Sequence, residues 1–381
     1  MKKKSTILMV CVLMLSMLAA GCTSGGKENA AESPSAPPAS SNAASNEPDA
    51  NSGADPSKLP SGTKIGIASR EILNDYNRGI IAGAQSAIEA AGGSVIVVDG
   101  QSDPGKHNEN ITNLINSGVK GIVVSLGDAQ QLAPVVAKAN EAGIPVVTTA
   151  IGAQVEGTVS DVGGDEPLMA SMMARALLSS INYKGDVYVF WVPGAPLLET
   201  RKRVLEAIVA DYPQVKLHEV PTEHNPARVQ VQMQDILTAN PKKGSVAGVW
   251  VAYDLLATGA SEAIRQAGRN EIKMAAIDGD LAGFQMLFQE NSPFVATVSQ
   301  DVNYMGQVAA EALIQAINGH KDQIPRALFT TAFVATQKNG VAAAEKRWGT
   351  EFWDKVRLNK ADIESKFPQT EQVVVVKPVV P

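Results

Sequence analysis

From residue 64 onward, short runs of β-branched residues alternate with amphipathic helical segments that end at glycine. Residues 64–68 and 95–99 have the composition of buried strands, and residues 76–91 between them have helical periodicity. Gly92 and Gly93 follow, where a helix commonly ends in a left-handed residue. Because right-handed crossovers join parallel strands through helices, this alternation predicts an α/β fold built on parallel sheets.

The alternation occurs in two runs, separated near Gly163-Gly164. The first run predicts strands at 64–68, 95–99, 121–125 and 144–150, and the second predicts strands at 187–192, 215–220, 246–253, 272–277 and 294–299. Predicted helices occupy 76–91, 104–116, 129–142, 165–180, 197–212, 226–239, 254–267 and 281–289. About 320 residues follow Pro60, more than one core usually holds. We therefore expect two doubly wound lobes, with ligands at the carboxyl ends of their strands.

The first 22 residues have the pattern of an exported lipoprotein. Lysines at positions 2–4 precede an apolar stretch at 7–20, and Gly21-Cys22 follow. A stretch of about fourteen residues is too short to span roughly 30 Å of hydrocarbon. Ala19 occupies the place where a lipobox usually has leucine, and a secretory signal with a chance cysteine is the alternative. We predict a signal peptide at 1–21 and an acylated Cys22 that anchors the protein at the extracytoplasmic face of the cell membrane.

Residues 22–60 are predicted to be a lipid-anchored linker without a fold of its own. Beyond Cys22 the segment consists almost wholly of Ala, Ser, Pro, Asn, Gly and acidic residues, and it has no aromatic residue. Such a composition cannot bury enough apolar surface to offset the entropy of ordering. As a flexible coil it has an r.m.s. span of roughly 35 Å, so it holds the folded body clear of the lipid head groups.

Composition excludes several classes of function. Cys11 and Cys22 are the two cysteines, so the folded body has none for a disulfide, a thiolate nucleophile or a zinc site. Removing the three leader lysines changes the formal charge from −6 to −9, which argues against a nucleic-acid partner. The dinucleotide, Walker, zincin and nucleophile-elbow motifs are absent from the sequence. We therefore expect no enzyme activity, no metal and no cofactor.

Six short motifs, in order, resemble the type I periplasmic binding proteins of sugar transporters, and the ribose-binding branch most of all. They begin at Gly83, Asp99, Gly118, Ala142, Asp278 and Ala296, and they read GAQ, DGQSDP, GVKGI, AGIPVV, DG and ATVSQ. The resemblance covers residues 64 to about 338. It implies two similar lobes joined by a three-strand hinge, with crossings near 162–163, near 300–301 and within 323–332.

The expected boundaries follow from this resemblance. The N-terminal lobe is expected at 61–162 plus about 301–325, and the C-terminal lobe at 163–300 plus about 326–340. Residues 341–381, with Trp348 and Trp353, extend past the resemblance and are expected to form a C-terminal extension.

In the first lobe, the resemblance implies ligand contacts from Asn74, Tyr76 and Asn77. Asn74 keeps the amide of the family and Tyr76 its aromatic ring, whereas Asn77 replaces a second ring. After the strand at 144–150 the family has an aspartate and an arginine, but Ala150 and Ile151 stand here. Part of the expected hydroxyl clamp is therefore missing, and ribose itself becomes doubtful as the ligand.

In the second lobe, the resemblance implies contacts from Arg201, His224, Tyr253, Asp278 and Gln300. The register of the arginine segment leaves Glu199 as an alternative to Arg201. Asp278 could instead be a plain strand-end turn, Tyr253 a core residue and His224 a solvated loop residue. Trp191 and Trp250 are expected in the core.

The resemblance implies a binding lipoprotein that captures a sugar, polyol or nucleoside-like small molecule and delivers it to the membrane permease of an ABC importer. A sensory lipoprotein that presents its ligand to a membrane histidine kinase or receptor is the alternative, because both use two lobes that close on a ligand.

Overall fold

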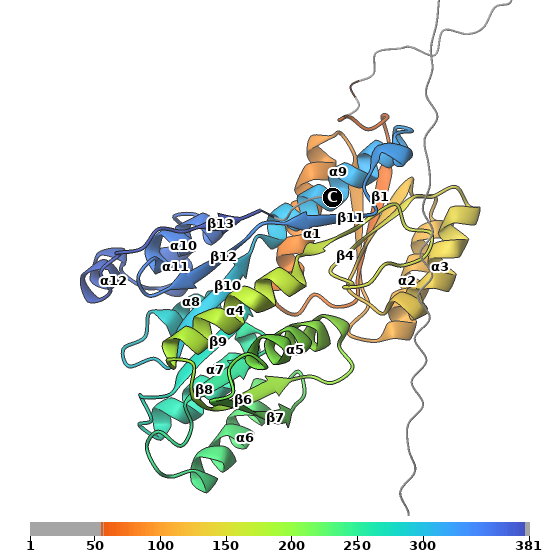
Figure 1. Ribbon diagram of the computed structural model, residues 1–381. Coiled ribbons are helices and arrows are strands. Elements are labelled where there is room, and N and C mark those ends of the chain that lie inside the picture. The colour runs from red at the N-terminus through yellow and green to blue at the C-terminus, as the bar shows by residue number, and fades with distance from the viewer. Residues whose placement is uncertain (1–54, 56, 378–381) are drawn as a thin grey trace, which may run out of the picture. The chain divides into compact units, whose positions relative to one another are not determined.

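The computed structural model describes Asp55 and residues 57–377, so Cys22, the predicted signal peptide and most of the predicted linker lie outside the described residues. The described chain folds into two parallel-dominated sheets with helices on their faces (Figure 1). This confirms the predicted fold class. Among these residues, no helix has the length and apolar character needed to cross a membrane.

The first sheet is six-stranded and parallel, in the order β11-β5-β4-β3-β1-β2. Its strands are β1 (Lys64–Ser69), β2 (Ser94–Asp99), β3 (Gly121–Ser125), β4 (Val146–Thr149), β5 (Asp161–Gly164) and β11 (Ala327–Thr330). One face is covered by α1 (Asp75–Ala90) and α9 (Val302–Ile317), which a short 3₁₀ turn, η1 (Lys321–Gln323), follows. The other face is covered by α2 (Pro104–Asn116) and α3 (Ala129–Glu141).

The second sheet is seven-stranded, in the order β13-β12-β10-β9-β8-β6-β7. Its strands are β6 (Gly185–Trp191), β7 (Val215–Pro221), β8 (Gly248–Val251), β9 (Lys273–Asp278), β10 (Phe294–Gln300), β12 (Ala332–Thr336) and β13 (Val375–Val376). The last two are antiparallel to their neighbours. Helices α4 (Glu166–Ser180) and α5 (Pro196–Val209) cover one face, and α6 (Pro226–Ala239), α7 (Asp254–Gln266) and α8 (Leu281–Leu287) cover the other.

The chain passes between the sheets after β5, after β10 and after β11. The third passage lies at residue 331, inside the expected range of 323–332 and later than the lobe boundary expected near 325. Strand β11 pairs with β5 of the first sheet as far as Thr330, and β12 of the second sheet begins at Ala332. Residues 326–330 therefore belong to the first lobe, because their hydrogen bonds complete the edge of its sheet.

Helices α1 and α9 lie side by side on the first sheet, although they are far apart in the sequence (Figure 1). Their backbones meet at glycine. A Cβ atom on Gly83 would lie 1.9 Å from the carbonyl oxygen of Asn303, and one on Gly306 would lie 1.9 Å from that of Ile80. Only glycine permits this approach, which returns α9 to the first lobe after the second passage.

Both ends of the described chain pack more closely than the sequence predicts. Leu59 is buried in the core of the first lobe, and its backbone N–H donates to Ala91 at 2.9 Å. The linker therefore ends before Pro60, where the sequence analysis had placed its boundary.

The described part of the predicted C-terminal extension packs onto the second lobe. It forms α10 (Gly340–Trp348), α11 (Phe352–Val356), α12 (Lys360–Lys366) and β13. Phe352, Val356 and Ile363 are buried in the core of the second lobe, and β13 pairs with β12.

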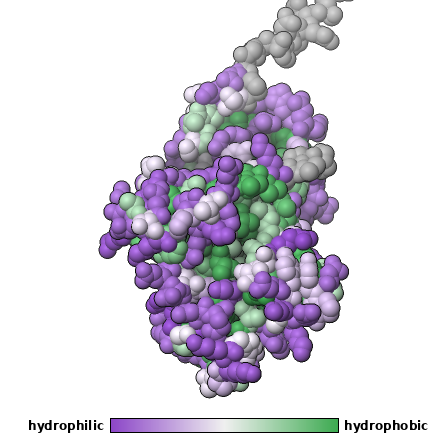
Figure 2. Space-filling view, turned by 60° about the vertical axis from the view of Figure 1, so that its left-hand side comes forward, coloured by the Kyte–Doolittle hydropathy of each residue, from purple (hydrophilic) through white to green (hydrophobic). Residues whose placement is uncertain are grey.

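The side chain of an aspartate or asparagine caps most of the described helices, and α4, α8 and α9 begin within three residues of a strand end. The side chains of Asp165, Asp280 and Asp301 accept backbone N–H groups at the starts of α4, α8 and α9. Polar side chains are therefore concentrated at the carboxyl ends of the strands. On the face seen in Figure 2, hydrophilic residues cover most of the surface and hydrophobic residues gather in a band at its middle.

Candidate functional site

A buried ion pair lies at the start of α4 and α5 in the second lobe. The guanidinium of Arg201 donates from Nε to Glu166 at 2.6 Å and from Nη2 to the other Glu166 oxygen at 3.2 Å. Its Nη1 donates to the carbonyl oxygen of Ala252 at 2.7 Å. Burial lowers the pKa of Arg201, but the carboxylates of Glu166 and Asp278 outweigh burial and raise it above its ordinary value. Arg201 is therefore a fixed, charged donor.

Asp278 and Gln300 meet at the carboxyl ends of β9 and β10. The Gln300 amide nitrogen donates to Asp278 Oδ1 at 3.4 Å, and Arg201 Nη1 lies 3.6 Å from the same oxygen. Burial raises the pKa of Asp278 to about 7, although Arg201 and Gln300 oppose the shift. The side-chain oxygen of Gln300 is buried and has no hydrogen-bond partner among the described residues. A buried acceptor without a donor is costly, so this corner is suited to a polar ligand.

Tyr76 of the first lobe lies within electrostatic range of this cluster. Burial raises the pKa of the Tyr76 hydroxyl, and the nearby carboxylates of Glu166 and Asp278 raise it further. Tyr76 comes from the first turn of α1, whereas Glu166 and Asp278 come from the second lobe. The structure therefore brings an aromatic ring from one lobe close to buried charges of the other.

Asn74 and Asn77 stabilise the start of α1. The Asn74 side chain caps the helix by accepting the backbone N–H of Asn77 at 3.0 Å. The Asn77 amide is buried and donates to Glu71 at 3.3 Å. Both residues therefore have a structural role. These two hydrogen bonds use the amide oxygen of Asn74 and the amide nitrogen of Asn77.

His224 and Tyr253 form a pair beyond the ends of β7 and β8. Nδ1 of His224 lies 2.8 Å from the Tyr253 hydroxyl, and the ring centroids are 5.9 Å apart. Desolvation raises the pKa of Tyr253, and Asp278 and Glu71 raise it further. Burial lowers the pKa of His224, and the Glu71 carboxylate partly opposes this shift by raising it. The pair therefore lies on the exposed side of the second lobe, within electrostatic range of Glu71 in the first lobe.

Apolar packing occupies the positions of the missing clamp. Ala150 and Ile151 are 5% and 2% exposed and belong to the two cores of the first lobe. Close in sequence, the half-buried Asp161 at the start of β5 accepts the Thr148 hydroxyl at 2.8 Å. Burial raises the pKa of Asp161 to about 6, and the Asp161 carboxylate raises the pKa of Tyr76.

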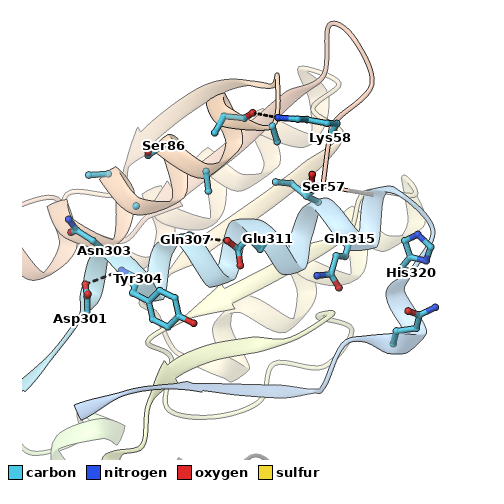
Figure 3. Close-up of a pocket in the computed structure, with 17 residues that line it drawn as sticks. Ser57, Lys58, Ser86, Asp301, Asn303, Tyr304, Gln307, Glu311, Gln315 and His320 are labelled. Carbon is cyan, nitrogen blue, oxygen red and sulfur yellow. Dashed lines mark hydrogen bonds between the residues drawn. The ribbon is translucent and has the colours of Figure 1, made fainter. Parts of the chain in front are cut away.

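A separate groove lies on the outer side of α1 and α9 (Figure 3). Its volume is about 950 Å³, and exposed side chains such as Tyr304, Gln307 and Glu311 line it. These residues belong to one lobe and include no buried charge, so the cluster between the lobes is the better candidate for a binding site.

Sequence reasoning named Arg201, Asp278, Gln300 and Tyr76, which the structure brings together. The alternative in the arginine segment, Glu199, accepts Trp191 Nε1 at 3.2 Å and the Gly194 N–H at 3.0 Å, away from the cluster. Trp191 and Trp250 are buried in the core, as predicted.

Three carboxylates that the sequence analysis missed also belong to this region: Glu166, Asp254 and Asp280. Asp254 is fully buried, and its pKa is raised by burial and by Asp280. The sequence signal for Asp254 was its position directly after the predicted strand at 246–253. Glu166 had no such signal, because an acidic residue in the first turn of a helix is common.

Comparison with known proteins identifies the family. The profile described as "Periplasmic binding protein domain" matches residues 65–321. The chain belongs to the periplasmic binding protein family. Ribose import binding protein RbsB of Bacillus subtilis (strain 168) is 27% identical over 261 residues, which are 68% of this chain and 83% of that protein. RbsB of Escherichia coli (strain K12) is 25% identical over 260 residues, 68% of this chain and 86% of that protein.

Solved structures agree with this assignment. An ABC transporter solute-binding protein from Agrobacterium vitis with bound allitol is 26% identical, has a TM-score of 0.70, and covers 75% of this chain and 99% of its own. A 5-methylthioribose transporter solute-binding protein from Thermotoga lettingae shares the fold, with 24% identity and a TM-score of 0.67. The match covers 81% of this chain and 98% of that protein's chain. The resemblance to type I binding proteins of sugar transporters is thereby confirmed.

Proposed function

We propose that the protein is an extracytoplasmic binding lipoprotein that captures a sugar or sugar-like molecule and delivers it to the permease of an ABC importer. The observation that carries this proposal is the buried cluster of Arg201, Asp278 and Gln300 opposite Tyr76. Asp278 and Gln300 stand at strand ends of the second lobe, Arg201 reaches them from α5, and Tyr76 comes from the first lobe. Ligands of open parallel sheets bind at such ends.

The chemistry of the cluster suits hydroxyl groups. Asp278 offers two acceptor oxygens to neighbouring hydroxyls, and Gln300 can accept through its unpartnered oxygen. Tyr76 supplies a ring for the apolar face of a sugar or polyol. We also assign Asn74, Asn77, His224 and Tyr253 to the rim of this site, where the amide nitrogen of Asn74, the amide oxygen of Asn77 and the rings of His224 and Tyr253 can reach a ligand.

The ligand class that this lining favours is a neutral sugar or polyol, with a nucleoside-like compound as the wider alternative. Relatives with related names include a xylitol-binding protein of Mycolicibacterium smegmatis and the ribose proteins above. The buried Ala150 and Ile151 remove the charged pair that would grip adjacent hydroxyls, so we expect ribose to bind more weakly than a ligand with an apolar substituent or a longer chain.

Anchoring is part of the proposal. The leader, the short apolar stretch and Cys22 support a lipid anchor, and the composition of the following linker supports a tether that lets the folded body meet a membrane permease.

The test is a thermal-shift screen of the soluble chain from Ser24 onward. The panel contains D-ribose, D-allose, xylitol, allitol and 5-methylthioribose, with L-leucine and L-glutamate as controls. A ligand at 100 times its dissociation constant adds about 2.7 kcal/mol of stability, which is readily detected. We expect at least one panel member to raise the unfolding temperature. A shift with the amino acids alone would contradict the proposal.

A further inference from the structure

The C-terminal segment beyond the family match reaches the turn that follows β9. The match ends at residue 321, whereas Trp348 closes α10 and its indole Nε1 donates to the carbonyl oxygen of Gly279 at 3.0 Å. Gly279 directly follows Asp278. A residue outside the region that the family profile matches therefore holds the backbone beside the central carboxylate of the candidate site.

This turn has a backbone conformation that needs external support. Asp278 has φ 134° and Gly279 has φ 64°, so two successive residues lie at positive φ. A Cβ on Gly279 would lie 2.1 Å from the Ser299 hydroxyl, which makes glycine necessary at this position. A non-glycine residue at positive φ is strained, and it persists only where its surroundings fix it.

Two groups supply that support from different elements. The buried Asp254 carboxylate accepts the Gly279 N–H at 2.9 Å and the Asp280 N–H at 3.2 Å, and the Thr297 hydroxyl donates to it at 2.8 Å. The Trp348 indole N–H donates to the carbonyl oxygen of Gly279. Both polar groups of Gly279 are thus held by side chains, one from α7 and one from α10.

The Trp348 ring is itself held in place. The Arg347 guanidinium lies 4.2 Å from its ring centroid, a distance typical of a cation–π contact. Arg347 is 8% exposed and its Nε has no partner among the described residues. Burial lowers the pKa of Arg347, and the nearby carboxylates of Asp301, Asp278 and Asp280 oppose that shift. The charge of Arg347 is therefore placed against the acidic end of the candidate site.

We propose that Trp348 is a positioning residue for sugar binding: its indole N–H fixes the Gly279 peptide and so orients the Asp278 carboxylate toward the ligand. The inference rests on the proposed function, because it takes Asp278 as a ligand contact. Trp348 itself need not touch the ligand. The competing explanation is that Trp348 only packs α10 onto the second lobe.

The experiment compares Trp348→Phe with a matched control, Trp353→Phe. Both tryptophans lie in the C-terminal segment, and Trp353 Nε1 donates to Glu345 at 2.9 Å, away from the turn. Titration calorimetry is run with whichever of the five panel compounds shifts the unmodified protein most. We expect Trp348→Phe to raise its Kd about five- to tenfold and Trp353→Phe to change it less than twofold. Trp348→His keeps a ring donor and should restore part of the affinity.

Two further arms separate positioning from packing. In an Asp278→Ala background, Trp348→Phe should change Kd less than twofold, because the carboxylate that it orients is gone. In the ligand-free protein, amide hydrogen exchange of the peptide containing Gly279 and Asp280 should accelerate in Trp348→Phe and not in Trp353→Phe.

The outcomes are distinct. Equal effects of Trp348→Phe with and without Asp278, or equal exchange in Trp348→Phe and Trp353→Phe, would overturn the positioning role. If no panel compound binds the unmodified protein, the proposed function fails, and the exchange measurement still decides whether Trp348 holds the turn. If Trp348→Phe does not fold, the exchange and affinity of Trp348→His decide the question in the same way.

Discussion

Replacing Glu166 by glutamine tests the buried ion pair most sharply. The side chains of Arg201 and Glu166 are 3% and 8% exposed, and the pair makes two charge-assisted hydrogen bonds. Removing one partner of a buried pair costs about 3–5 kcal/mol, because the other charge stays buried. Asp278 at 3.6 Å and the retained amide oxygen compensate in part, so we expect a loss of about 3 kcal/mol in the free energy of unfolding.

The assay is urea unfolding followed by tryptophan fluorescence. Trp191, Trp250, Trp348 and Trp353 all lie in the second lobe, so the signal reports the lobe that contains the pair. An unchanged slope with urea would show that the midpoint shift reflects stability. The matched control is Glu206→Gln in the same helix as Arg201. Its ion pair with Lys202 is 41% exposed at Glu206, and we expect a loss of about 0.5 kcal/mol or less.

A double variant separates stability from binding. Arg201→Met with Glu166→Leu removes both charges together, and such replacements are often close to neutral for stability. We expect it to lose less stability than Glu166→Gln alone and still to bind the panel sugars poorly. A loss below 1 kcal/mol for Glu166→Gln would refute the reasoning, since the pair would then be solvated in the folded protein.

Three further predictions concern pH, anchoring and motion. The pKa of Asp278 is about 7 in the folded protein against an ordinary 3.8, so the folded state binds the proton more tightly. Its contribution to the free energy of unfolding should therefore fall as pH rises from about 4 to 7, and unfolding of Asp278→Asn over this range should lack that fall. Cys22→Ala should abolish lipid labelling in a bacterium that processes lipoproteins; an unchanged labelled fraction would exclude the site. A saturating panel sugar should reduce the radius of gyration in small-angle scattering, and no change would argue against hinge closure.

The sequence was sufficient for the regular part of the fold. Most strands and helices between residues 64 and 300 follow from local periodicity, because most of these strands contain buried apolar residues and most of the helices have one apolar face. Strands β5 and β11 were expected only as hinge crossings implied by the resemblance, and β12 and β13 were missed. They are two to five residues long, and their partners are distant in the sequence, so no local pattern marks them.

The candidate site divides in the same way. Asp278 and Gln300 could be predicted because they end strands and keep residue types of the resembled family. Glu166 could not, since its role depends on Arg201, 35 positions away. Trp348 belongs to a segment that no resemblance covered, and its contact with Gly279 spans 69 positions. Such contacts depend on tertiary packing that periodicity does not encode.

The most direct test of the central claim is titration calorimetry of Asp278→Ala with the panel sugar that binds the unmodified protein most tightly. The alanine variant loses the charge-assisted bonds between Asp278 and the ligand and leaves their partners unpaired, which costs roughly 2–4 kcal/mol of binding free energy. The account predicts a Kd about 30- to 1,000-fold higher, with folding retained. Full affinity in Asp278→Ala would contradict it, because the ligand would then bind somewhere other than this cluster.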